Sequence, residues 1–116
     1  MDILDTENGL ELVGGEYELY NSLLKEFIDG KKFEKSVLLD YYSSGKMDEC
    51  AAYVHFFKGA ARQICGQKVA AVGQKLEDVF RGKAQGDVLQ LTEEFDFCNG
   101  ELNQYIFNYL KEQDLS

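Results

Sequence analysis

The residues best suited to chemistry lie in the stretch AAYVHFFKGAARQICG, residues 51–66, which contains the only histidine of the chain. If this stretch is helical, Lys58 and Gly59 lie one turn from His55, on the same face. A neutral imidazole is a nucleophile, and a nearby ammonium group offsets the charge of a phosphate attached to the ring. The spacing therefore suits acceptance of a phosphoryl group by His55. The commoner case for such a residue is an unreactive surface histidine on a helix that binds another protein.

The apolar spacing of this helix predicts which way His55 points. Apolar residues four and three positions apart predict the buried stripe: Cys50, Val54, Phe57, Ala61 and Ile64. His55 is one residue, about 100° of turn, away from Val54. Its helical neighbours are small or positively charged, which predicts an open face: Ala51, Ala52, Lys58, Gly59 and Arg62. Tyr53, Phe56 and Ala60 fall on the other flank of the stripe, where we expect them to pack against a neighbouring helix.

Helical periodicity extends through nearly the whole chain, and no segment shows the alternation of a strand. The expected helices are 6–13, 16–41 with a bend or break at Asp29-Gly30, 47–64, 67–81 and 88–111. In the last helix the residues expected to face inward are Val88, Leu91, Phe95, Cys98, Leu102, Tyr105, Ile106 and Tyr109. Because 116 residues suffice for one core, we expect a single domain over residues 1–116. The predicted fold is all-α, an antiparallel four-helix bundle with a short additional N-terminal helix.

The composition argues against several classes of function. A formal net charge of −9 disfavours nucleic-acid binding, which needs a basic surface. The positive charge is concentrated in residues 55–83, which contain six basic and two acidic residues. No apolar run approaches the roughly 20 residues of a membrane span, and the acidic N-terminus does not resemble a secretion signal. We therefore expect a soluble, cytoplasmic monomer. Three cysteines without a C-x-x-C pair indicate reduced thiols rather than a zinc site.

Several stretches follow a known pattern. HFFKGAARQICG, from His55, is similar to H-x-[LF]-K-G-[SAG]-[SA]-x-x-[ILF]-G, the signature of histidine-phosphotransfer (HPt) domains, and the chain resembles that family. The stretch NGLELVGGEYELYNSLLKEF at 8–27 resembles the usual opening of the family. SSGKMDECAAYVHFFKG resembles the turn and lead-in to the family's active helix, and QKLEDVFRGK resembles the helix that follows it. The similarity covers about residues 8–83. Two positions depart from it. Cys65 replaces a glycine, which predicts a helix-ending turn displaced by one residue, to Gly66, and Ala60 replaces a frequent serine.

The resemblance implies a function and a set of roles. An HPt domain takes a phosphoryl group from the aspartyl phosphate of a receiver domain on its exposed histidine, and passes it to another receiver. His55 would be the acceptor, Lys58 would position or neutralise the phosphoryl group, and Gly59 would keep the approach open. We further infer polar support or partner contact from residues outside these roles: Ala51, Ala52, Arg62, Gln63 and Arg81.

The resulting hypothesis is a phosphorelay intermediate, a phosphocarrier rather than an autonomous kinase, because no nucleotide-binding glycine loop is present. Its partners would be response-regulator receiver domains, including that of a hybrid histidine kinase. No cofactor is expected on this chain, since the Mg²⁺ needed for aspartyl chemistry would be bound by the receiver. The alternative is a non-catalytic helical adaptor that binds a receiver-like partner without phosphotransfer. A metal or haem bundle needs inward-facing ligands, which one outward histidine does not supply.

Overall fold

The computed structural model describes residues 1–114, and its regular structure is entirely helical. The helices are α1 (Thr6–Leu12), α2 (Tyr17–Asp29), α3 (Lys35–Ser43), α4 (Met47–Gln63), α5 (Gln67–Phe80) and α6 (Val88–Asp114). No strand occurs within the described residues, so the predicted all-α class is confirmed. Apart from the segment 16–41, the predicted helix boundaries agree with these to within a few residues. In residues 1–114, no helix combines the length and the apolar character that crossing a membrane requires.

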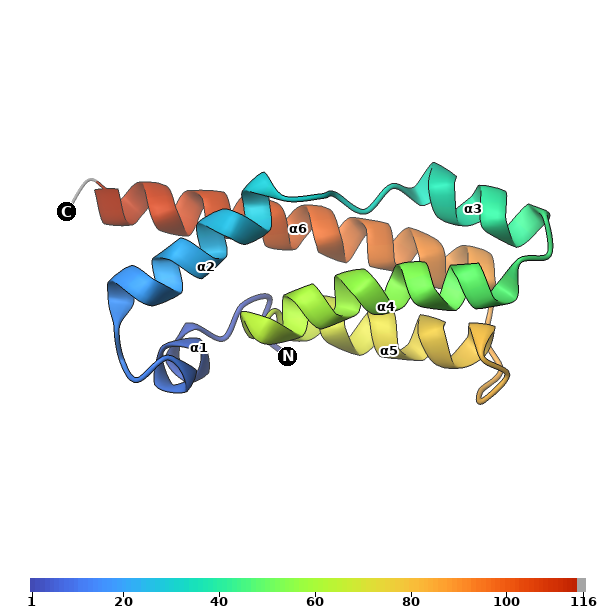
Figure 1. Cartoon of the computed structure of the whole chain (residues 1–116), viewed down its shortest axis with the longest axis horizontal. Helices are drawn as coiled ribbons and strands as arrows, with labels where there is room; N and C mark the ends of the chain where they lie inside the picture. The colour runs from blue at the N-terminus through green and yellow to red at the C-terminus, as the bar shows by residue number, and fades with distance from the viewer. Residues whose placement is uncertain (115–116) are drawn as a thin grey trace.

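The segment 16–41 forms two separate helices, α2 and α3. Helix α2 ends at Asp29, and Gly30 adopts an extended conformation with φ −82° and ψ −167°. Residues 30–34 then connect the two helices without helical structure. The predicted interruption at Asp29-Gly30 is therefore a complete break. Figure 1 shows that this extended connection lets α2 and α3 follow one another along the length of α6.

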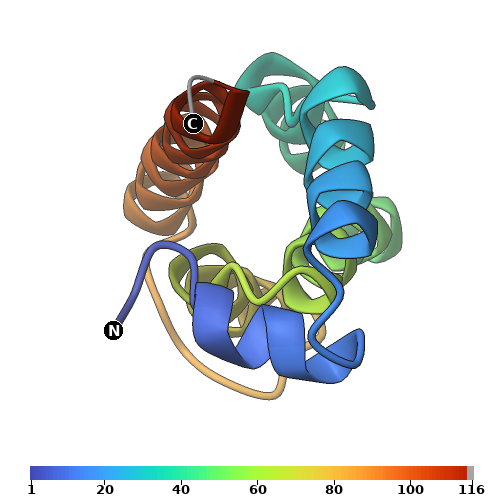
Figure 2. The ribbon, with the colours of Figure 1, turned by 90° about the vertical axis from the view of Figure 1, so that its left-hand side faces the viewer.

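The helices lie side by side in an elongated molecule of 49 × 23 × 20 Å. Helices α4 and α5 form a hairpin joined by residues 64–66, and they are the most extensively packed pair. Helix α6 packs on α5 and on both α2 and α3, and α3 also contacts α4. Figure 2, which looks along the molecule, shows these helices arranged around a common centre. Helix α1 lies across one end of the α4–α5 hairpin (Figures 1 and 2).

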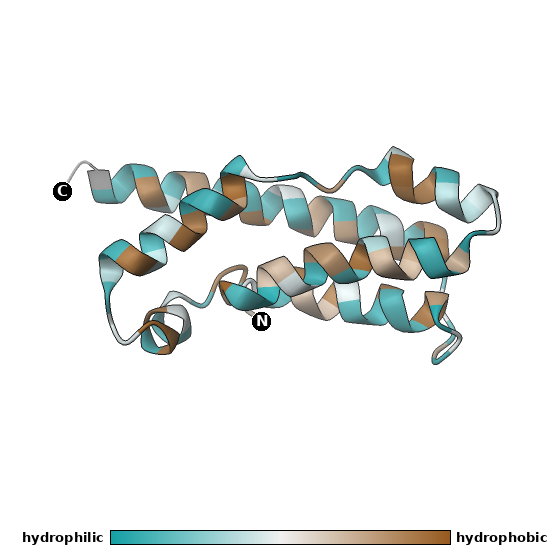
Figure 3. Cartoon of the chain, in the orientation of Figure 1, coloured by the Kyte–Doolittle hydropathy of each residue, from teal (hydrophilic) through white to brown (hydrophobic). Residues whose placement is uncertain are grey.

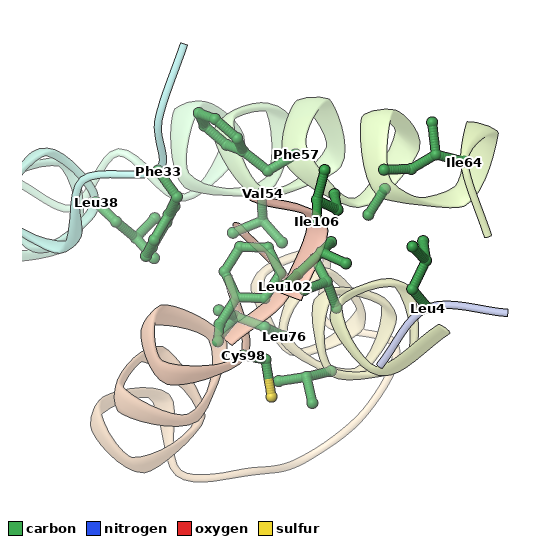
Figure 4. Packing of buried hydrophobic residues seen from close by; sticks show 14 of the residues in the cluster. Leu4, Phe33, Leu38, Val54, Phe57, Ile64, Leu76, Cys98, Leu102 and Ile106 are labelled. Carbon is green, nitrogen blue, oxygen red and sulfur yellow. The ribbon is translucent and has the colours of Figure 1, made fainter. Parts of the chain in front are cut away.

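The common centre is filled by apolar side chains. Apolar and polar residues alternate along each long helix (Figure 3), and the apolar ones meet between the helices (Figure 4). The largest completely buried side chains are Tyr20, Phe95, Leu24, Leu38, Leu76, Leu102 and Ile106. All five residues of the predicted stripe on α4 are buried, so this prediction is confirmed. Each large apolar side chain buried in this way contributes about 1.5–3 kcal/mol, which makes the core the main source of stability.

Tyr105, Phe56 and Ala51 differ from their expected burial. Tyr105, expected to face inward, is exposed, because the adjacent Ile106 occupies the core position of that turn. Phe56, expected to pack against a neighbouring helix, is also exposed, and its ring faces the ammonium of Lys31. Ala51, expected on the open face, is completely buried. Helix α5 packs closely on α4 and contacts the face that carries His55 and Lys58.

The turn between α4 and α5 is not displaced, so the expectation of a shift to Gly66 was wrong. Helix α4 ends at Gln63, and Cys65 itself adopts the left-handed conformation, with φ +66°. The amide of Gly66 donates to the Ala61 carbonyl at 2.8 Å, and the amide of Cys65 to the Arg62 carbonyl at 3.1 Å. This is the hydrogen-bond pattern of a Schellman turn. Its cost is that a residue with a Cβ occupies a conformation that glycine adopts without strain.

Candidate functional site

His55 lies in the middle of α4, on the side that faces α5. The helix is stabilised at its ends, because Asp48 and Glu49 in the first turn and Arg62 in the last complement its dipole. The His55 side chain is 60% exposed, so its predicted surface position is confirmed. Its Nδ1 lies 3.1 Å from Oε1 and 3.2 Å from Oε2 of Glu77 on α5. The imidazole is therefore both accessible to a partner and held in place.

Glu77 is the centre of the polar cluster around His55. Its side chain is only 7% exposed, and the Nζ of Lys58 lies 2.7 Å from its Oε1. The Nε of Arg81, one turn further along α5, donates to its Oε2 at 2.8 Å. Glu77 is not among the site residues predicted from the sequence. The signal that could have found it is its isolation, since Glu77 and Asp78 are the only acidic residues in the basic segment 55–83.

The ionisation of Glu77 determines which nitrogen of the His55 ring carries the hydrogen. Burial raises the pKa of the Glu77 carboxyl, but hydrogen bonds from Lys58, Arg81 and His55 outweigh it and lower the pKa to about 2. At neutral pH the carboxylate has no hydrogen to donate, so the imidazole must be the donor in their contact. The hydrogen therefore sits on Nδ1, and the lone pair of a neutral ring is on Nε2.

Lys58 is buried, which corrects the expectation of a mobile cation on an open face. Its side chain is 6% exposed, and its Nζ contacts Glu77 at 2.7 Å and donates to Gln74 Oε1 at 3.0 Å. Gln74 is held in turn by Asp78, because its Nε2 donates to the Asp78 Oδ1 at 2.9 Å. The close packing depends on Gly73, where a Cβ would lie 2.9 Å from the Lys58 Cβ. Helix α5 can close over Lys58 because position 73 has no side chain.

The surface next to His55 is open at two of the three small residues expected there. A Cβ at Gly59 would meet no atom within 4 Å, and Ala52 is exposed. Ala51 is completely buried and does not line the approach. A partner can therefore reach His55 over Gly59 and Ala52.

Of the polar residues inferred outside the motif, the structure brings Arg81 into the cluster through its hydrogen bond to Glu77. Arg62 and Gln63 are exposed near the end of α4. Within the described residues, neither forms a hydrogen bond with His55, Lys58 or Glu77. They lie on the exposed surface of the same helix and are available for contact with a partner.

The cluster presents one nucleophilic nitrogen in a positively charged setting. Lys58 and Arg81 supply two positive charges against the single negative charge of Glu77. The free Nε2 belongs to an exposed ring, so it can attack an electrophilic centre carried by another macromolecule. Within the described part of the chain, no group of three or more His, Cys, Asp or Glu side chains could hold a metal ion.

Comparison of the chain with protein-family models, with curated proteins and with solved structures gave no match.

Proposed function

We propose that this chain is a histidine-phosphotransfer domain, in which His55 carries a phosphoryl group between receiver domains. The observation that carries the proposal is the contact between His55 Nδ1 and the Glu77 carboxylate, which leaves Nε2 unprotonated on an exposed ring. The HPt-like pattern of residues 8–83 supports the same function from the sequence. A histidine that only contributed to a binding surface would not need a buried carboxylate to fix its tautomer.

The proposed fold is the antiparallel four-helix bundle of that family. Helices α4, α5 and α6 would each form one column, the α2–α3 pair would form the fourth, and α1 would be the additional N-terminal helix. The packing of α4 on α5 and α3, and of α6 on α5, α2 and α3, supports this arrangement. It puts His55 on the outer surface of one column, where a partner can approach it.

In the proposed transfer, the Nε2 lone pair attacks the phosphorus of a receiver's aspartyl phosphate and forms an N–P bond. The P–O bond to the aspartyl group breaks, and its electron pair leaves with the aspartyl carboxylate. The ring keeps the hydrogen on Nδ1 and becomes positively charged, and the ionised Glu77 offsets that charge. Attack by the aspartate of a second receiver then breaks the N–P bond and returns the neutral ring. The chain contributes positioning and charge compensation, which suit phosphoryl transfer.

The partners would be receiver domains of response regulators, including one belonging to a hybrid histidine kinase. Their acidic pocket, with Mg²⁺ bound to its own carboxylates, would meet the positive segment 55–83. Gly59 and Ala52 would leave room for the receiver's surface, while Arg62 and Gln63 would contact it further along α4. We propose that this exchange takes place in the cytoplasm with a monomeric chain.

The test is transfer of labelled phosphate from a phosphorylated receiver of the same organism. The native chain should acquire a label that is acid-labile and alkali-stable, as expected for phosphohistidine, and His55→Gln should acquire none. Because His55 is exposed, the circular dichroism of His55→Gln should match that of the native chain. Asp48→Asn, an exposed change near the start of the same helix, is the matched control and should still be labelled. Labelling of His55→Gln would exclude the proposal, and receiver binding without transfer would assign the chain to the adaptor alternative.

A further inference from the structure

We propose that Arg81, rather than Lys58, is the cation that contacts the phosphoryl group on His55, and that Lys58 is a positioning residue acting through Glu77. This inference rests on the proposed function of His55 and assigns separate roles to the two cations of its site.

Lys58 is confined between α4 and α5. Its side chain is 6% exposed, and its Nζ is committed to Glu77 Oε1 and Gln74 Oε1. Gly73 lies against the stem, so that a Cβ there would be 2.9 Å from the Lys58 Cβ and 3.2 Å from its Cγ. Movement of the ammonium toward solvent would also remove one partner from the buried Glu77 carboxylate, which is strongly unfavourable. Lys58 is therefore fixed on the protein side of Glu77.

Arg81, in contrast, is available to a group outside the protein. Its side chain is 38% exposed and lies at the C-terminal end of α5, beside the exposed loop that follows. Its Nε donates to Glu77 Oε2, and its terminal nitrogens donate no hydrogen bond to any described residue. A guanidinium group can hold one acceptor through Nε and offer its terminal N–H groups to a second. Arg81 can therefore keep its contact with Glu77 while it binds a phosphoryl oxygen.

The His55 imidazole and the Arg81 guanidinium both contact the Glu77 carboxylate. His55 Nδ1 lies 3.2 Å from Glu77 Oε2, and Arg81 Nε lies 2.8 Å from the same oxygen. The exposed guanidinium is thus next to the exposed imidazole, and both face solvent more than Lys58 does. A phosphoryl group on Nε2 adds negative charge close to the ionised Glu77. Arg81 is the more exposed of the two cations that contact Glu77. It is therefore the cation that can lie between the phosphoryl group and the Glu77 carboxylate.

The test uses phosphoramidate, which transfers its phosphoryl group to histidine with loss of ammonia and needs no receiver. The intact chain is labelled on His55, and the ³¹P signal of the phosphoryl group is followed as a function of pH. With Arg81→Gln the midpoint of this titration should rise by about 1 pH unit, because an opposite charge in contact favours the dianion. Arg81→Lys should give an intermediate midpoint. With Lys58→Met the midpoint should move by less than about 0.3 pH units. The share of neutral, unphosphorylated His55 rings that carry their hydrogen on Nδ1 should fall, because Glu77 is no longer held in place.

A second measurement uses the native chain alone, so it does not depend on whether the Lys58→Met variant folds. In ¹⁵N-labelled protein, phosphorylation should shift the terminal N–H signals of Arg81 downfield and leave the Lys58 ammonium signal in place. A shift of the Lys58 signal with none at Arg81 would overturn the inference, as would an unchanged titration midpoint in Arg81→Gln. Failure of phosphoramidate to label His55 would also overturn it, since Nε2 would then not be available. Failure of the labelled chain to exchange phosphate with a receiver would count against the proposed function alone.

Discussion

Gly73 of α5 lies so close to Lys58 of α4 that a Cβ at position 73 would be 2.9 Å from the Lys58 Cβ. The same Cβ would be 2.9 Å from the Cε1 of Phe95 on α6. Both neighbours are buried, so neither can move aside without disturbing the core. The missing side chain at Gly73 therefore determines how closely α5 approaches the residues that hold Glu77.

Gly73→Ala is expected to lower the free energy of unfolding by about 1–3 kcal/mol, because overpacking outweighs the better helix propensity of alanine. Phosphotransfer should slow by roughly tenfold, since the displaced Lys58 no longer positions Glu77 correctly. Urea unfolding and the transfer assay measure the two effects. The matched control is Gly100→Ala on α6, where a Cβ would meet no atom within 4 Å. This variant should be slightly more stable than the native chain. A Gly73→Ala variant as stable as Gly100→Ala would show that α5 has room to move.

Gly59 gives the opposite expectation, because a Cβ there would meet no atom within 4 Å. Gly59→Ala should raise the free energy of unfolding by about 0.5–1 kcal/mol through helix propensity alone. Gly59→Leu should remain folded but slow transfer by at least roughly tenfold, because the larger side chain covers the approach to His55. Comparison of the two variants in the same transfer assay separates stability from access. Transfer by Gly59→Leu at the native rate would show that receivers do not approach over this residue.

Glu77 is expected to make stability depend on acid pH. Its pKa is lowered in the folded chain from 4.5 to about 2, so its contribution is complete above pH 4.5 and is lost as the pH falls toward 2. The shift corresponds to a contribution on the order of 3 kcal/mol. Glu77→Gln should therefore be less stable than the native chain at pH 7, and the difference should narrow between pH 4.5 and pH 2. Urea unfolding across this range measures it, and a constant difference between the two proteins would contradict the buried, ionised carboxylate.

Cys65 is expected to be strained, because its φ of +66° is one that L-residues with a Cβ rarely adopt. Cys65→Gly should be more stable than Cys65→Ala by about 1 kcal/mol, since both variants lose the buried thiol and only glycine relieves the backbone. The comparison with alanine is the control for the lost packing. Equal unfolding midpoints for the two variants would mean that the turn has relaxed to another conformation.

The exposure of His55 and the approximate ends of the helices were predictable from the sequence because they depend on local spacing. The stripe of Cys50, Val54, Phe57, Ala61 and Ile64 fixes the orientation of α4, and the orientation of His55 follows from it. The break after Asp29 was also visible, because Gly30 interrupts the periodicity. Each of these inferences concerns residues within a few turns of one another.

The burial of Lys58 and the central position of Glu77 could not be predicted in the same way. Both depend on how closely two helices approach, and Glu77 follows His55 by 22 positions in the chain. Helical spacing shows that Lys58 shares a face with His55, but not that α5 covers part of that face. Similarly, spacing alone does not show that Ile106 takes the core position and leaves Tyr105 exposed. Gly73 is the residue in the sequence that indicates close approach of α5 to α4. It becomes informative only once Lys58 is known to be its neighbour on α4.

Within residues 1–114, the polar cluster around Glu77 is built entirely from the hairpin of α4 and α5 and the residue that follows it. Among the described residues, the side chains that form hydrogen bonds or ion pairs with Glu77 belong to residues 55–81, so the reactive arrangement is encoded by one short continuous segment of the chain. Within the described part of the chain, helices α1, α2, α3 and α6 supply no polar partner to Glu77. Substitutions outside that segment that preserve the core are thus expected to be nearly neutral for reactivity. Partner choice can then change on the surrounding surface while the nucleophile and its counter-ion stay the same.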